Sequence, residues 1–140
     1  MTKYLLDTDI CIFLLRKKFS ISEKIAAVGT SNCYVSAVTI GELIFGAHNS
    51  TNFEKHKYDA DRIMSLMTVL PILESLDSYG KEKARLRKAG HLIPELDLLI
   101  ATTALHHNMT LVTNNTRHMQ RIDGIRLENW TKAEDNAFIK

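Results

Sequence analysis

Carboxylate and amide side chains stand at separate places in this sequence where the surrounding residues are mostly apolar. Asp7 ends a short apolar run, Glu42 lies inside an apolar segment, Asp97 opens a Leu- and Ile-rich segment, and Asn115 follows another apolar run. An unpaired carboxylate is costly to bury, and several carboxylates held together need a proton or a cation to neutralise them. Oxygen ligands without His or Cys partners favour Mg²⁺, with Mn²⁺ as the alternative, over zinc.

A Mg²⁺ ion held by such acids would suit phosphate-ester chemistry. The ion lowers the pKa of a bound water, orients it and stabilises charge on the phosphate. Basic clusters at residues 16–18 and 81–88, with Arg117 and Arg121, could hold flanking phosphates. Each cluster taken singly is better explained as a solvated helix face, and a net charge of +2 is too small to argue for nucleic acid by itself.

Some of the acids also have simpler structural explanations. Asp9, or Thr8, could be the N-cap of a helix that begins at Ile10, and Asp97 could simply meet the dipole in the first turn of a helix. Glu42 is different, because neither a cap nor the dipole explains a carboxylate in the middle of an apolar helix. It needs a cation or strong hydrogen-bond donors.

Strand and helix signals alternate along the chain, and Pro71 favours an edge position for its strand. This alternation predicts an α/β fold with a mostly parallel central sheet covered by helices on both faces. Right-handed crossovers then bring the carboxyl ends of the strands, and with them the acids, to one edge of the sheet. The strands are expected at 3–6, 32–36, 68–72, 110–113 and 125–130, a polar turn at 114–116, and the helices at 10–17, 20–29, 37–47, 50–67, 77–89 and 95–107.

The length of 140 residues suits one domain, expected at residues 1–130 with a tail at 131–140. No apolar run approaches the ~20 residues that a membrane span needs, and there is no signal peptide, so a cytoplasmic protein is expected. Cys11 and Cys33 are expected to be reduced core residues. The helix at 37–47 has almost no polar face, which predicts that part of it meets another chain.

Motifs around these residues resemble those of the PIN-domain ribonucleases and, within them, the VapC-type toxins. The resemblance implies a three-layer α/β/α sandwich, Mg²⁺-dependent endonucleolytic cleavage of RNA, a homodimer, and inhibition by a small VapB-like antitoxin. The matching pieces are residues 5–9, 38–43, 97–101 and 111–115.

The resemblance also assigns roles to individual residues. It implies metal ligation by Asp7 and Asp97, with Glu42 as a further ligand or a water-positioning acid. Asn115 stands where the family often has a fourth acid, which puts a second tightly held metal ion in doubt. Thr113 and Asp9 are candidates for positioning water or substrate.

Other functions remain open at this stage. Asp7-Thr8-Asp9 after a strand is similar to the nucleophile motif of haloacid-dehalogenase-like phosphohydrolases, although that reading leaves Glu42 unexplained. A catalytically silent PIN-like RNA-binding module is a second alternative, suggested by Asn115. A receiver-like domain is a third, but no lysine follows the last strand. Nothing in the sequence selects the RNA, although similar toxins often cut structured RNA such as tRNA.

Overall fold

The computed structural model describes residues 1–132. Short strands alternate with helices, and two 3₁₀ turns, η1 (Thr30–Asn32) and η2 (Leu73–Ser75), precede β2 and α5. The elements in order are β1 (Tyr4–Leu6), α1 (Thr8–Leu15), α2 (Ile21–Val28), β2 (Cys33–Ser36), α3 (Ala37–His48), α4 (Phe53–Leu66), β3 (Thr68–Leu70), α5 (Leu76–Ala89), α6 (Glu95–His106), β4 (Thr110–Val112), α7 (Thr116–Met119) and β5 (Arg126–Glu128). The expected tail at residues 131–140 lies almost entirely outside the described residues.

The strands form one five-stranded sheet in the order β3-β2-β1-β4-β5, and every neighbouring pair is parallel. The prediction of a mostly parallel sheet is therefore confirmed. β3 is an edge strand, as Pro71 indicated, although Pro71 itself follows the strand. Because all strands run the same way, the residues after β1 and β4 meet at one edge of the sheet.

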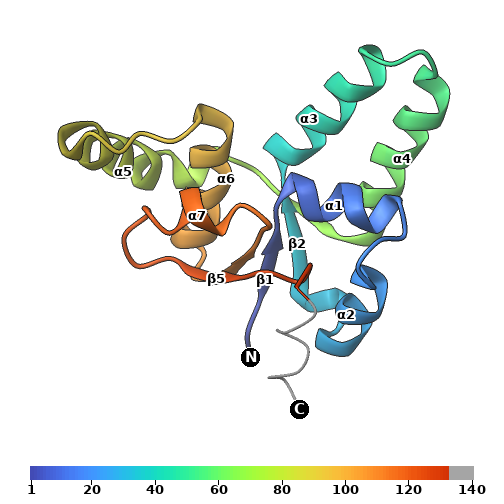
Figure 1. The fold of residues 1–140 in the computed structure, drawn as a ribbon, viewed down its shortest axis with the longest axis horizontal. Helices are drawn as coiled ribbons and strands as arrows, with labels where there is room; N and C mark the ends of the chain where they lie inside the picture. The colour runs from blue at the N-terminus through green and yellow to red at the C-terminus, as the bar shows by residue number, and fades with distance from the viewer. Residues whose placement is uncertain (133–140) are drawn as a thin grey trace.

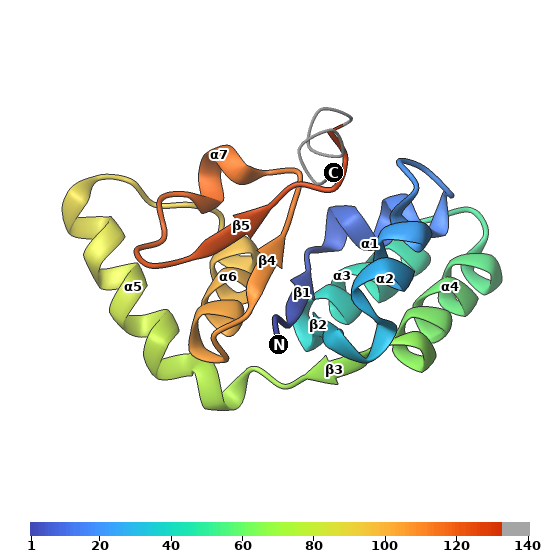
Figure 2. The ribbon, with the colours of Figure 1, turned by 90° about the horizontal axis from the view of Figure 1, so that it is seen from below.

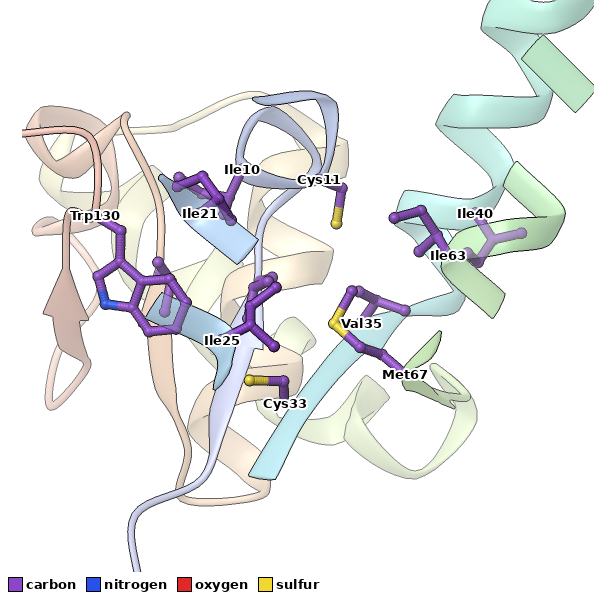
Figure 3. Packing of buried hydrophobic residues seen from close by; sticks show 12 residues of the cluster. Ile10, Cys11, Ile21, Ile25, Cys33, Val35, Ile40, Ile63, Met67 and Trp130 are labelled. Carbon is purple, nitrogen blue, oxygen red and sulfur yellow. The ribbon is translucent and has the colours of Figure 1, made fainter. Parts of the chain in front are cut away.

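Helices cover both faces of this sheet (Figures 1 and 2). Leu6, Val35 and Val112 point into a core formed with α1, α2, α3 and α4, whereas Leu5 and Leu111 point into a core formed with α5 and α6. The alternation follows from the two-residue period of a strand. Figure 3 shows the first core, in which Trp130 and both cysteines pack among Ile side chains. Cys11 and Cys33 are free thiols.

Two local predictions need correction. The first helix begins at Thr8 rather than Ile10, and its N-cap is Asp7, whose carboxylate accepts a hydrogen bond from the backbone N–H of Thr8. Asp9 therefore lies inside the first turn and is not the cap. The expected turn at 114–116 leads into the short helix α7, which was not predicted because four residues are too few to show a helical period.

The apolar helix α3 is only partly buried in this chain. Its Ile40 packs in the core, but Phe45 is 67% exposed. Figure 1 shows α3 and α4 side by side as a hairpin that projects from the sheet. The exposed apolar surface of α3 agrees with the expected contact to another chain.

Candidate active site

Asp7 is the buried centre of the candidate site. It follows β1 and is only 5% exposed. Its Oδ1 accepts a hydrogen bond from the backbone N–H of Thr8 at 2.8 Å, and its Oδ2 accepts one from the Thr113 hydroxyl at 2.8 Å. Burial, followed by the negative charge of Asp9, raises the pKa of Asp7 to about 7, even though both hydrogen bonds favour the charged form.

Asp9 and Asp97 add negative charge around Asp7. Asp9 accepts hydrogen bonds from the backbone N–H groups of Ile10 at 2.7 Å and Asn114 at 3.0 Å. Burial raises the pKa of Asp9 despite those bonds, and the charge of Asp97 raises it further. Asp97 lies half-buried in the first turn of α6, where burial raises its own pKa and the charge of His118 lowers it. Each of the three carboxyl groups therefore disfavours ionisation of another.

Glu42 joins this group through a hydroxyl rather than through direct contact. It is half-buried on α3, and its Oε1 accepts a hydrogen bond of 2.6 Å from the Thr8 hydroxyl. Thr8 Oγ1 also lies 2.9 Å from Oγ1 of the fully buried Thr39. The strong donor that a carboxylate in this apolar helix requires is thus Thr8, which follows Asp7 directly.

The loop after β4 closes the other side of the site. Thr113 is fully buried, and its hydroxyl oxygen accepts a hydrogen bond of 2.9 Å from the backbone N–H of Asn115 while its hydrogen goes to Asp7. The Asn115 amide nitrogen lies 3.3 Å from Nδ1 of His118 on α7. The structure thus links Thr113 directly to Asp7, and Asn115 to Asp7 through Thr113.

Sequence reasoning missed several polar groups that complete the site. Thr8 bonds to Glu42, Thr39 bonds to Thr8, the backbone of Asn114 binds Asp9, and His118 contacts Asn115. Thr8 had one available signal, because it stands between two candidate acids. His118 had none, since its place depends on the unpredicted helix α7.

The donor atoms of these side chains are oxygens, the ligand type that a hard divalent ion such as Mg²⁺ prefers. Among residues 1–132, no group of three or more His, Cys, Asp or Glu side chains forms a ready-made metal cage. Mg²⁺ does not need one, because it keeps several waters and is usually bound through one or two carboxylates. Both Asp7 oxygens accept one hydrogen bond each, so each retains a lone pair for a cation. Burial is the main cause of the raised pKa values of Asp7, Asp9 and Asp97, and neighbouring carboxylates raise those of Asp7 and Asp9 further, so a bound cation would favour the charged forms.

No helix in the described part of the chain has both the length and the apolarity to cross a membrane.

Comparison with known proteins identifies the family. Residues 4–125 match the PIN domain, whose ribonucleases generally depend on a divalent metal ion. The chain is 34% identical over 133 residues to the tRNA(fMet)-specific endonuclease VapC of Shigella flexneri, covering 94% of this chain and 100% of that protein. It is also 34% identical over 132 residues to ribonuclease VapC2 of Haemophilus influenzae, covering 93% of this chain and 99% of that one.

Solved structures agree with this assignment. The DNA-bound VapBC of Salmonella typhimurium superposes with a TM-score of 0.86 at 34% identity, covering 93% of this chain and 99% of the matched chain. VapBC2 of Rickettsia felis, bound to a DNA fragment from its promoter, gives a TM-score of 0.85 at 30% identity, covering 92% and 99%. The chain therefore belongs to the PIN-domain family and, within it, to the VapC ribonucleases.

Proposed function

We propose that this protein is a Mg²⁺-dependent endoribonuclease that hydrolyses RNA phosphodiester bonds as the toxin of a VapBC-type toxin–antitoxin pair. The observation that carries the proposal is the buried carboxylate of Asp7, coupled to Asp9 and Asp97 at one edge of the parallel sheet. Hard oxygen ligands favour Mg²⁺, with Mn²⁺ as a substitute. The general dependence of PIN-domain ribonucleases on a divalent metal ion supports a metal-dependent reaction.

Each site residue has a role in this proposal. Asp7 and Asp97 hold the ion, which supplies charge neutralisation at the carboxylates and at the scissile phosphate when it is bound. Glu42 is a further ligand or the acid that positions the attacking water and accepts its proton. Thr113 keeps Asp7 oriented, Asp9 adds negative charge beside Asp7, and the Asn115 amide helps to position water or phosphate. Asn115 brings no charge, so we propose one tightly held metal ion rather than two.

A structured RNA such as tRNA is the proposed substrate. The Shigella flexneri relative is named for cleavage of tRNA(fMet), and it aligns with nearly the whole chain. Arg117 is exposed on α7 next to His118, whose charge acts on Asp97, and it can contact a phosphate without reading a base.

The proposed partners are a VapB-like antitoxin and a second copy of this chain. The solved relatives include VapBC complexes, and they match this chain over nearly its full length. The exposed apolar side of α3 is the proposed contact surface, as the sequence suggested. Two free, buried cysteines fit a reducing compartment, so we place the protein in the cytoplasm.

Incubation with total tRNA tests the activity. We expect fragments with Mg²⁺, none with EDTA, and none with Asp97→Asn, while Asp61→Asn on the exposed side of α4 cleaves like the wild type. A phosphomonoester assay runs in parallel. Phosphate release without RNA cleavage would favour the phosphohydrolase, and RNA that is bound but uncut would favour the silent binding module.

A further inference from the structure

We propose that Thr8, supported by Thr39, is the positioning residue that fixes Glu42 relative to Asp7. The inference deepens the proposed nuclease function and rests on it. Asp7 and Glu42 lie on opposite sides of Thr8 in the hydrogen-bond network, and they belong to different elements of the fold. Thr8 is the residue whose main chain binds one acid and whose side chain binds the other.

The directions of the hydrogen bonds follow from counting hydrogens. A threonine hydroxyl has one hydrogen to donate. Thr8 gives its hydrogen to Glu42 Oε1, at 2.6 Å. Thr39 Oγ1, 2.9 Å from Thr8 Oγ1, must therefore donate to Thr8. Thr39 therefore donates to Thr8, and Thr8 donates to Glu42. The first donor of this series, Thr39, is fully buried.

The backbone of Thr8 completes the arrangement. Its N–H donates to Asp7 Oδ1 at 2.8 Å, so the same residue holds a carboxylate at the end of β1 and another on α3. Thr8 is the first residue of α1 and has no preceding helical turn, whereas a threonine deeper in a helix commonly bonds to a carbonyl of the turn before it. Thr102 does so on α6, where its hydroxyl donates to the carbonyl of Leu98 at 2.8 Å. The Thr8 hydroxyl on α1 instead donates to Glu42 on α3, so it can fix the position of an acid on a different helix.

Thr8 links Glu42 to Asp7, because the Glu42 carboxylate accepts a hydrogen bond from the Thr8 hydroxyl and the Asp7 carboxylate accepts one from the Thr8 N–H. Glu42 is therefore one residue away from Asp7 in the hydrogen-bond network. That placement suits a residue that orients water beside the ion, and it makes Thr8 a supporting partner of the site.

Thr8→Val tests the inference because it keeps the shape of threonine and the backbone N–H but removes the hydroxyl. Supporting partners of metal sites change activity or metal affinity by about 10- to 100-fold. We expect Thr8→Val to lower kcat for RNA cleavage by about that factor while KM changes little. Thr8→Ser, which restores the hydroxyl, should recover most of the activity. Thr39→Val should give a smaller loss, and Thr102→Val, a buried hydroxyl on another helix, should cleave like the wild type.

A double-mutant cycle separates this role from general destabilisation. If Thr8 acts through Glu42, Thr8→Val should cause no further loss in a Glu42→Gln background. Calorimetric binding of Mn²⁺ to the same variants provides a readout besides cleavage, and we expect Thr8→Val to bind Mn²⁺ nearly as tightly as the wild type, whereas Asp7→Asn loses binding.

The outcomes distinguish this inference from the proposed function. If the wild type does not cut RNA with Mg²⁺, the proposed function fails first. If the wild type cuts, Glu42→Gln does not, and Thr8→Val and Thr39→Val cut normally, the inference alone is overturned. Independent losses from Thr8→Val and Glu42→Gln would overturn it as well. Circular dichroism of each variant checks folding, and Thr39→Val preserves the test if Thr8→Val does not fold.

Discussion

Thr113 donates its hydroxyl hydrogen to Oδ2 of Asp7 at 2.8 Å, although 106 residues separate the two in sequence. The contact exists because β1 and β4 are parallel neighbours, so that both residues lie just beyond the same end of the sheet. Thr113 is fully buried, and its oxygen also accepts the N–H of Asn115. The Thr113 hydroxyl thus bonds both to Asp7 and to the backbone of the loop that carries Asn115.

Thr113→Val should therefore destabilise the protein and weaken cleavage together. The substitution leaves an oxygen of Asp7 without its donor and the Asn115 N–H without its acceptor. An unsatisfied buried polar group costs about 1–3 kcal/mol. Urea unfolding measures the loss, with Thr113→Ser as the variant that keeps the hydroxyl and Thr110→Val as a buried control on β4. Equal stability of Thr113→Val and the wild type would show that the contact contributes little.

The raised pKa of Asp7 predicts an unusual pH dependence of stability without metal. Burial, then Asp9, raises this pKa from 3.8 to about 7, so between these values the folded state holds a proton that the unfolded state has released. The free energy of unfolding should then fall as pH rises through this window, by at most about 1.4 kcal/mol per pH unit from this group, and level off above it.

Asp7→Asn isolates this contribution, because an amide does not titrate. In EDTA, the variant should show a flatter dependence between about pH 4 and pH 7 and should be more stable than the wild type above that window. Urea unfolding across the pH range measures both effects, with the exposed Asp61→Asn as control. Parallel curves for wild type and Asp7→Asn would contradict the raised pKa. The same substitution should abolish RNA cleavage.

Metal binding should have the opposite pH dependence. A carboxylate must lose its proton before it binds a cation, so Mn²⁺ or Mg²⁺ should bind more tightly as pH rises toward and past the pKa of Asp7. The rise in melting temperature on adding Mn²⁺ should accordingly be larger at about pH 8 than at about pH 6. A shift of the same size in Asp97→Asn would show that the ion binds elsewhere.

Sequence patterns predicted much of the sheet and the identity of the acids. Apolar runs end at Asp7 and before Asn115. Because the alternation of elements predicts parallel strands, the ends of these two runs are expected at the same edge of the sheet, where the site lies. The patterns did not reveal the Thr8–Glu42 hydrogen bond, since nothing along the chain states which helices face one another. They also predict a first helix that begins at Ile10 with Asp9 or Thr8 as its cap, whereas Asp7 both follows the strand and caps the helix.

Glu82 is a buried acid with a structural role away from the site. Its side chain on α5 is 7% exposed, accepts two hydrogen bonds from Arg85, and accepts the backbone N–H of Asp123 at 3.2 Å. The pKa of Glu82 is lowered, and the hydrogen bonds from Arg85 are the main cause. Its contribution to stability is therefore present above the unfolded pKa, near 4.5, and lost as pH falls below it.

Glu82→Ala should lower the free energy of unfolding by about 1 kcal/mol at neutral pH, because it removes the acceptor of the Arg85 and Asp123 hydrogen bonds, whose donors can turn to water instead. The difference from the wild type should shrink at acid pH. Thermal and urea unfolding measure it, and Glu54→Ala on the exposed side of α4 is the control. A loss that does not depend on pH would mean that packing, rather than the charge, is responsible.

Phe45 tests the proposed contact between chains. It is 67% exposed on a helix whose Ile40 and Ala47 are buried. A substitution at such an exposed position usually changes the free energy of unfolding by less than about 0.5 kcal/mol. Phe45→Asp should therefore fold normally but weaken the homodimer or the antitoxin complex, because it places a charge in an apolar interface. Light scattering after size exclusion measures the mass, with and without co-expressed antitoxin. Leu73→Asp, at a position 78% exposed on η2, is the matched control. If both variants retain the wild-type mass in both experiments, the apolar side of α3 is not the contact, and its exposure must be explained without a partner.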